Sequence, residues 1–137
     1  WKMGLSGEDK MAYDCGQLLA VADAIERWAL RTKAEDSKNI RATTAMRYYT
    51  RFSQKPCDTW KLICNKLVPY QIQLGEKGNY LYELKGKISG QLVEEGFATA
   101  KNLNGMFCLG FDSMRTELIH RSIAKSQEKK HDTVISE

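Results

Sequence analysis

The chain has 137 residues and a formal net charge of +4, with 42% apolar and 28% charged residues. This length and composition predict one globular domain whose core needs neither disulfides nor a metal ion. No apolar run approaches the roughly 20 residues of a membrane span, and no segment has the charged start and apolar run of a signal peptide. We therefore expect a soluble cytoplasmic protein with no membrane among its partners.

The first predicted helix covers about residues 8–31. Ser6 can cap its N-terminus, and Glu8 and Asp9 place acids in the first turn. Apolar residues recur at intervals of three and four, which gathers them on one face: Cys15, Leu18, Ala22, Ile25 and Ala29. Gly16 and Ala20 lie four residues apart, so a neighbouring backbone can approach closely there.

A polar loop over residues 32–39 leads to a second predicted helix, about residues 38–53, which Ser37 or Asn39 can cap. One of its stripes is apolar and faces the core: Ala42, Ala45, Tyr49 and Phe52. The next stripe is basic and partly aromatic: Arg41, Thr44, Tyr48, Arg51 and Lys55. Pro56 is expected to end this helix, and Asp58 to cap the third.

The third and fourth predicted helices are joined by a turn at Gly75–Asn79. The third has one apolar face, made of Trp60, Ile63, Cys64 and Leu67, and Pro69 is expected to kink or end it. The fourth covers about residues 80–95. Its Gly86 and Gly90 each cost about 1 kcal/mol relative to alanine, and a close helix crossing would explain them.

Residues 96–103 form a short connection, and Asn104 can cap a fifth helix. Phe107, Phe111, Met114 and Leu118 form its apolar stripe, and further apolar residues beside this stripe predict a place in the middle of the bundle. The ends, about residues 1–6 and 130–137, are expected to fray. The expected fold is therefore all-α: one domain over residues 1–137, a bundle of about five helices.

The sequence offers little material for catalysis. His120 and His131 are the only histidines, so a Ser/His/Asp or Cys/His arrangement can hardly be built. The four cysteines form no C-x-x-C pair, and we expect them to be reduced thiols, with Cys15, Cys64 and Cys108 in apolar stripes.

The two carboxylate pairs, Glu35–Asp36 and Glu94–Glu95, are expected to lie on a solvated surface. We therefore expect no catalytic residue, no cofactor and no metal ion, and so no enzyme. A hydrolase with an unrecognised site is left as an alternative.

Positive charge is concentrated in one part of the chain. From Arg27 to Lys66, ten lysines and arginines stand against three acids, a net charge of +7 that exceeds the whole-chain value. Such a one-sided field attracts phosphate backbones. We call the candidate nucleic-acid-binding residues the basic band: Arg27, Arg31, Lys33, Lys38, Arg41, Arg47, Tyr48, Arg51, Lys55, Lys61 and Lys66. The alternative is an ordinary solvated face, with Tyr48 in the core.

Several segments resemble one known family. They are residues 12–21 (AYDCGQLLAV), residues 47–49 (RYY), the helix with Tyr80, Leu84 and Ile88, and residues 107–115 (FCLGFDSMR). They are similar to the C-terminal helical region of the large subunit of type I-C CRISPR surveillance complexes (Cascade). In that family the same region is also made separately as the small subunit, which the size of this chain fits better. Met3 would be the internal start, which leaves Trp1 and Lys2 in doubt as native residues.

The resemblance implies a structural role without a reaction. Small subunits of these complexes are helical bundles, usually present in more than one copy, that support the R-loop. The implied partners are the large and backbone subunits, the guide RNA and target DNA, and further copies of the chain. Cleavage would belong to a recruited helicase-nuclease. A protein-only scaffold, whose basic band meets acidic partner surfaces, is the alternative from another class.

Overall fold

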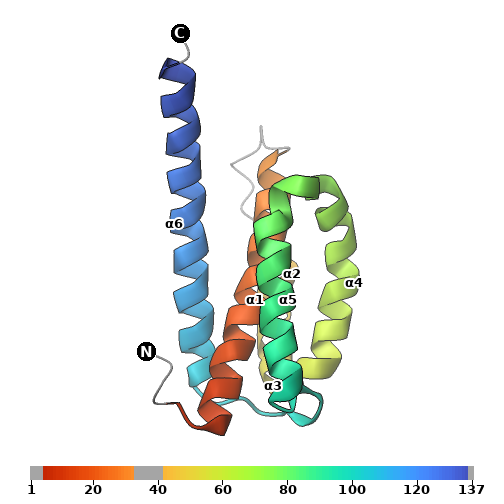
Figure 1. Ribbon diagram of the computed structural model, residues 1–137. Coiled ribbons are helices and arrows are strands. Elements are labelled where there is room, and N and C mark those ends of the chain that lie inside the picture. The colour runs from red at the N-terminus through yellow and green to blue at the C-terminus, as the bar shows by residue number, and fades with distance from the viewer. Residues whose placement is uncertain (1–4, 33–41, 136–137) are drawn as a thin grey trace.

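The computed structural model describes residues 5–32 and 42–135, with side chains described for residues 5–31 and 42–121. The prediction of an all-α fold is confirmed, and the described ranges contain no strand. They form six α-helices and two short 3-10 turns (Figure 1): α1 (Gly7–Thr32), α2 (Thr44–Arg47), α3 (Tyr49–Gln54), α4 (Pro56–Leu74), η2 (Gly75–Gly78), α5 (Asn79–Glu94), η3 (Phe97–Thr99) and α6 (Met106–Ile135).

Helix α1 is the centre of the bundle, and α4, α5 and α6 pack around it (Figure 1). Its residues 11–26 are buried on every side except at Tyr13. The expectation that the last helix lies in the middle is wrong, because α6 packs mainly on α1 and leaves Leu109 53% exposed. The predicted α6 stripe is nevertheless correct, since Phe107, Phe111, Met114 and Leu118 are all buried.

Two glycines allow α1 and α6 to touch backbone to backbone. A Cβ atom at Gly16 would overlap the carbonyl oxygen of Phe107, and one at Gly110 would overlap the carbonyl oxygen of Tyr13. The predicted close approach at Gly16 is therefore confirmed, with Gly110 as its counterpart. The crossing expected at Gly86 and Gly90 is wrong within the described chain, because a Cβ at either position would meet nothing within 4 Å.

The second predicted helix is shorter than expected and broken. Ser37 and Asn39 lie outside the described residues, Ala42 is exposed, and α2 begins only at Thr44. Thr43 is the N-cap, and its hydroxyl accepts a hydrogen bond from the Met46 amide at 3.3 Å. Tyr48, with φ −99° and ψ 8°, separates α2 from α3.

Pro56 ends the preceding helix as predicted, since α3 ends at Gln54, but helix α4 differs from the prediction at its N-cap and does not end at Pro69. Pro56 occupies its first turn, where a missing N–H costs nothing, so Asp58 does not cap it. The helix also continues through Pro69 to Leu74. Pro69 and Asn65, whose carbonyl loses its helical partner, are both exposed, so water can satisfy the freed group.

The turn between α4 and α5 and the cap of α6 agree with the prediction. The predicted turn after α4 is confirmed as η2, and the Tyr82 hydroxyl donates to the carbonyls of Gln71 and Gly75 at 3.1 and 3.0 Å. Asn104 caps α6 as predicted, since its side-chain oxygen accepts from the Met106 amide at 3.0 Å. Helix α6 then runs to Ile135, past residue 130, where fraying was expected.

We predict that Gly16→Ala lowers the free energy of unfolding by about 3 kcal/mol, at the upper end of the range for overpacking, because the added methyl group meets backbone atoms that cannot rotate away. Urea denaturation followed by circular dichroism measures this change. Gly86→Ala is the matched control, and it should raise stability by about 0.5 to 1 kcal/mol through helix propensity alone. Equal effects at the two sites would contradict the tight crossing.

Candidate nucleic-acid interface

The described members of the basic band lie on α1 to α4 and at the junction of α3 with α4. Lys33, Lys38 and Arg41 fall outside the described residues. Six charged members are exposed: Arg31, Arg47, Arg51, Lys55, Lys61 and Lys66. Because Arg31 lies in the last turn of α1 and Lys55 precedes α4, they lie toward opposite ends of the bundle (Figure 1). The band therefore extends along the bundle rather than forming a compact cluster.

Its densest part is the edge formed by α2 and α3. Arg47 and Arg51 are four residues apart, and the helical hydrogen-bond pattern largely continues past Tyr48, because the Phe52 amide donates to the Tyr48 carbonyl at 2.8 Å. Both arginine side chains are exposed, whereas Phe52, the residue after Arg51, is buried. Lys55 extends this edge, and no acidic residue occurs in α2 or α3.

Helix α4 divides its two lysines between different surfaces. Lys66 lies beside α2–α3, with its ammonium group 6.0 Å from the centre of the Tyr48 ring. Tyr48 itself is half-buried and packs on the core, so only part of its ring faces solvent. Lys61 precedes Lys66 by five positions, which rotates it by about 140° around the helix. It therefore points to the outer side of α4.

Arg27 is held by a carboxylate of its own helix. Its Nε donates to Oδ2 of Asp23 at 2.7 Å, and Arg115 of α6 approaches the same oxygen at 3.6 Å. The Thr43 hydroxyl donates to the other oxygen of Asp23 at 2.6 Å. Asp23 is fully buried and joins α1, α6 and the start of α2.

A second buried acid positions the arginine-bearing edge. Oε1 of Glu26 accepts a hydrogen bond from the Thr44 amide at 3.0 Å, at the N-terminus of α2. Asp23 and Glu26 are three residues apart on α1. Their hydrogen bonds hold Thr43 and Thr44, at the start of the helix that carries Arg47. Sequence reasoning missed these acids. The sequence contained a sign of their role, because Asp14, Asp23 and Glu26 lie within a mostly apolar stretch of the first helix.

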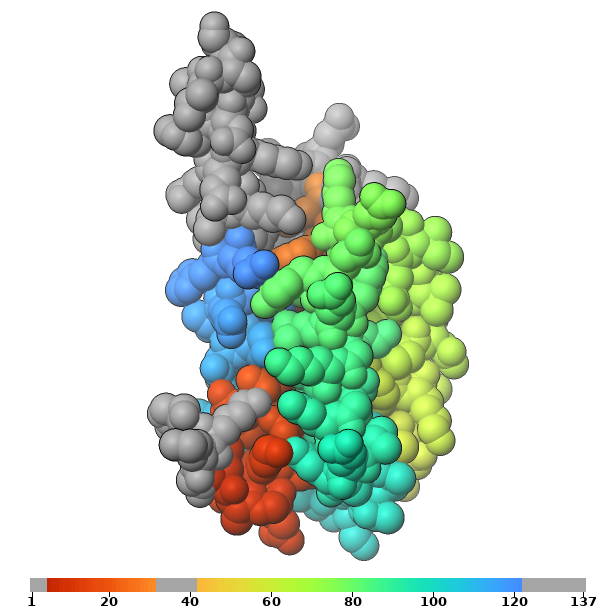
Figure 2. Space-filling model, viewed as in Figure 1, coloured from red at the N-terminus to blue at the C-terminus, as the bar shows by residue number. Residues whose placement is uncertain are grey.

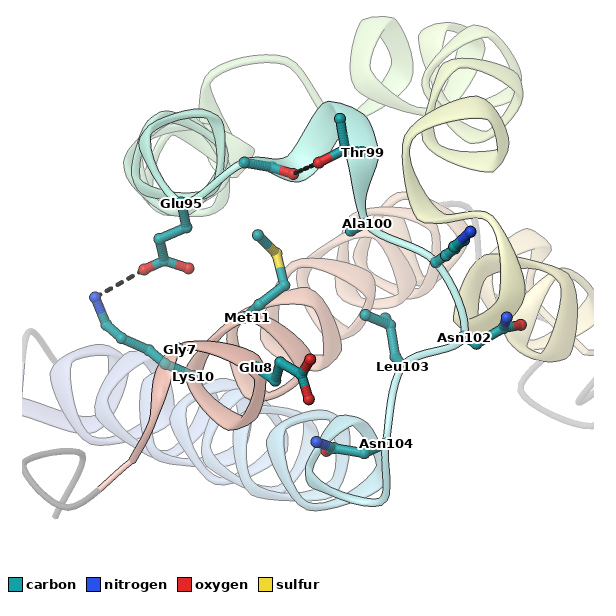
Figure 3. Close-up of a pocket in the computed structure, with 12 residues that line it drawn as sticks. Gly7, Glu8, Lys10, Met11, Glu95, Thr99, Ala100, Asn102, Leu103 and Asn104 are labelled. Atoms are coloured by element: carbon teal, nitrogen blue, oxygen red, sulfur yellow. Dashed lines mark hydrogen bonds and ion pairs between the residues drawn. The ribbon is translucent and has the colours of Figure 1, made fainter.

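A pocket of about 640 Å³, lined by both polar and apolar residues, lies at the N-terminal end of α1 (Figure 3). Lys10 reaches Glu95 across it, with Nζ 2.7 Å from Oε1. Glu95 is 18% exposed, so the expectation of a solvated Glu94–Glu95 pair fails for Glu95 and holds for Glu94. Burial raises the pKa of Glu95, Lys10 opposes the rise, and a hydrogen bond with buried Asp14 adds to it.

The cysteines divide by burial. Cys15 is buried as expected, and burial raises the pKa of its thiol, as it does for half-buried Cys64. Cys108 is exposed, so its expected place in an apolar stripe is wrong, and it accepts a hydrogen bond from the Tyr49 hydroxyl at 3.0 Å. Its position on α6 explains this, because it lies beside the buried stripe rather than in it.

None of the helices within residues 5–32 and 42–135 has the length and hydropathy of a membrane span. Among the described side chains, those of residues 5–31 and 42–121, no group of three or more His, Cys, Asp or Glu is arranged to hold a metal ion.

Comparison with protein families gives a match over most of the chain. The model of a family described as CRISPR-associated protein (Cas_Csd1) matches residues 1–119, which covers every helix up to the buried first half of α6. No curated protein and no solved structure matches the chain.

We predict that Asp23→Ala lowers the free energy of unfolding by about 2 to 3 kcal/mol, because it removes charged hydrogen bonds to Thr43 and Arg27. The loss should stay below that of a fully buried ion pair, since both arginines retain access to water. Thermal and urea denaturation measure it. Exposed Asp58→Ala is the control, and a similar loss there would contradict the assigned role of Asp23.

We predict that Glu95 makes stability fall with rising pH. A carboxyl group whose pKa is raised on folding binds its proton more tightly in the folded state, so stability declines as pH rises from the usual 4.5 through the folded value. Glu95→Gln should remove this decline, seen as a difference from the wild type that grows above pH 4.5 in denaturation series. Glu94→Gln should leave the profile unchanged, and an unchanged profile for Glu95→Gln would refute the prediction.

Proposed function

The chain belongs to the Cas_Csd1 family of CRISPR-associated proteins, and from this membership we propose that it is the non-catalytic small subunit of a type I-C RNA-guided surveillance complex. In this role it stabilises the R-loop through contacts with the nucleic-acid backbone and with neighbouring subunits. Guide pairing reads the target sequence, so the subunit needs to recognise only shape and charge.

The observation that carries the proposal is the exposed row of Arg47, Arg51 and Lys55 along the α2–α3 edge. Arginine forms paired hydrogen bonds with phosphate oxygens, and a lysine nearby adds a point charge. A row of cations with no acid in the same two helices follows a phosphate chain and reads no base. The displaced strand and the guide–target duplex both present such a chain.

The proposal includes a set of partners and a location. The subunit contacts the large subunit, the backbone subunits, the guide RNA, the target DNA and further copies of itself, in the cytoplasm. It requires no cofactor and catalyses no reaction. The hydrogen bonds that Asp23 and Glu26 accept from Thr43 and Thr44 anchor the start of α2, which gives these two buried acids a structural role.

A protein-only scaffold is the second candidate, and the outer side of α4 favours it. Leu62, Val68 and Ile72 are exposed there, and apolar side chains suit a protein contact better than a phosphate contact. In this alternative the basic band docks on acidic partner surfaces.

We predict that Arg47→Glu with Arg51→Glu leaves assembly of the complex intact and weakens its R-loops. The slope of log affinity against log salt should become shallower by about 0.7 to 0.9 for each phosphate that the variant no longer neutralises. Binding of the reconstituted complex to target DNA at several salt concentrations measures both quantities.

The matched control is Lys77→Glu, which reverses an exposed charge in η2, outside the basic band. It should change neither R-loop stability nor the salt slope. Loss of assembly in the double variant, with the DNA affinity of the remaining complex intact, would favour the scaffold instead.

A further inference from the structure

Two arginines from different helices meet at one buried carboxylate oxygen. Nε of Arg27 on α1 donates to Oδ2 of Asp23 at 2.7 Å, and Nε of Arg115 on α6 lies 3.6 Å from the same oxygen. The second distance is too long for a hydrogen bond. One carboxylate therefore serves two guanidinium groups, and two positive charges less one negative leave the three side chains with a net charge of +1.

The two guanidinium groups also carry donors that the described chain does not satisfy. Nη2 of Arg27 and Nε of Arg115 are both buried, and neither has a hydrogen-bond partner among the described residues. Asp23 has no oxygen to spare, because its Oδ1 already accepts from the Thr43 hydroxyl at 2.6 Å. A buried donor without an acceptor costs free energy. The arrangement therefore calls for an acceptor from outside the chain.

Both side chains nevertheless reach the surface. Arg27 is the first residue beyond the enclosed part of α1, and its side chain is 28% exposed, against 42% for Arg115. Figure 2 shows the last turns of α1 reaching the surface beside α6. Arg115 is the less tightly held of the two arginines. A ligand can therefore meet the pair after a rotation of that side chain, without opening the core.

We propose that Arg27 and Arg115 form a binding site for a phosphate group, with Asp23 as their common support. Guanidinium groups present paired N–H donors whose geometry matches phosphate oxygens. A phosphate has enough negative charge to offset the surplus of +1 and enough oxygens to accept from both arginines. The hydrogen bond from Arg27 to Asp23 holds one of the two guanidinium groups in place before the anion arrives, which reduces the entropy lost on binding.

The site adjoins the arginine-bearing edge of α2 and α3. Thr43, which donates to Asp23, is the N-cap of α2, and the Arg47 amide donates to its carbonyl at 3.0 Å. A strand bound along Arg47 and Arg51 is therefore the nearest source of a phosphate, and the site would continue its path onto α6. With this source the site rests on the proposed function and adds Arg115 to it. A free phosphate ion is the other source.

The first measurement is the response of the purified full chain to inorganic phosphate. A millimolar titration should raise the melting temperature of the wild type by about 3 °C, because a ligand of the folded state stabilises it. Arg115→Gln should lose this rise while Arg27 stays on Asp23. General stabilisation by phosphate as a salt is common to both proteins and cancels in the comparison. Arg115→Lys should recover the rise only in part, because an ammonium group lacks the paired donors.

Arg121→Gln is the matched control. It removes the same charge from the same helix, at a residue whose guanidinium carbon lies 3.6 Å from the centre of the Tyr80 ring on α5. Its melting temperature should respond to phosphate like that of the wild type. An equal loss of response in both variants would mean that phosphate senses only the total charge, and it would overturn the site.

The second measurement identifies the source of the phosphate. In the reconstituted complex, Arg115→Gln should make the slope of log affinity for target DNA against log salt shallower by about 0.7 to 0.9 if the site holds one strand phosphate. An unchanged slope with a lost phosphate response assigns the site to a free phosphate. Either result supports the site. It is overturned if Arg115→Gln matches the wild type in both measurements, even where the variant is less stable.

The outcome is separable from that of the proposed function. The Arg47→Glu, Arg51→Glu double variant should keep the phosphate response of the isolated chain, because it leaves Arg27 and Arg115 in place. A normal salt slope in the double variant, with the phosphate response lost in Arg115→Gln, would refute the nucleic-acid role and leave the site. An altered slope in the double variant, with Arg115→Gln like the wild type throughout, would refute the site alone.

Discussion

The backbone crossing of α1 and α6 at Gly16 and Gly110 is the constraint on which the other arrangements depend. It lets α6 lie so close to α1 that the central helix is buried on nearly every side. A helix enclosed in this way must find partners for each polar side chain that it carries, because an unpaired buried group costs free energy. The paired acids of α1 follow from that requirement.

Those pairings connect the core to the surface. Asp23 and Glu26 take hydrogen bonds from Thr43 and Thr44 and so set where α2 begins. The start of α2 in turn decides which residues of the next two turns face solvent. The exposure of Arg47 and Arg51 is therefore a consequence of buried carboxylates on a different helix.

The same acids alter the electrostatics of the basic band. Asp23 neutralises Arg27 and lies within ion-pair distance of Arg115, so the net charge of +7 between Arg27 and Lys66 overstates the field at the surface. The remaining exposed positive charge is concentrated along α2–α3, with Lys66 next to it. The outer side of α4, by contrast, combines Lys61 with apolar side chains, which is the composition of a protein contact. One basic segment in the sequence thus becomes two surfaces of different character.

The sequence by itself determined the helical class, the bounds of α1 and α5, the turn at Gly75 and the apolar stripe of α6. Local spacing and capping decide these features, and both can be read along one segment. Only the tertiary structure decided which helix is central, that Thr43 rather than Ser37 or Asn39 caps α2, that Arg27 binds Asp23, and that Gly86 and Gly90 face outward. Each of these depends on which side chains from distant segments meet, and the periodicity of a single helix contains no information about its neighbours.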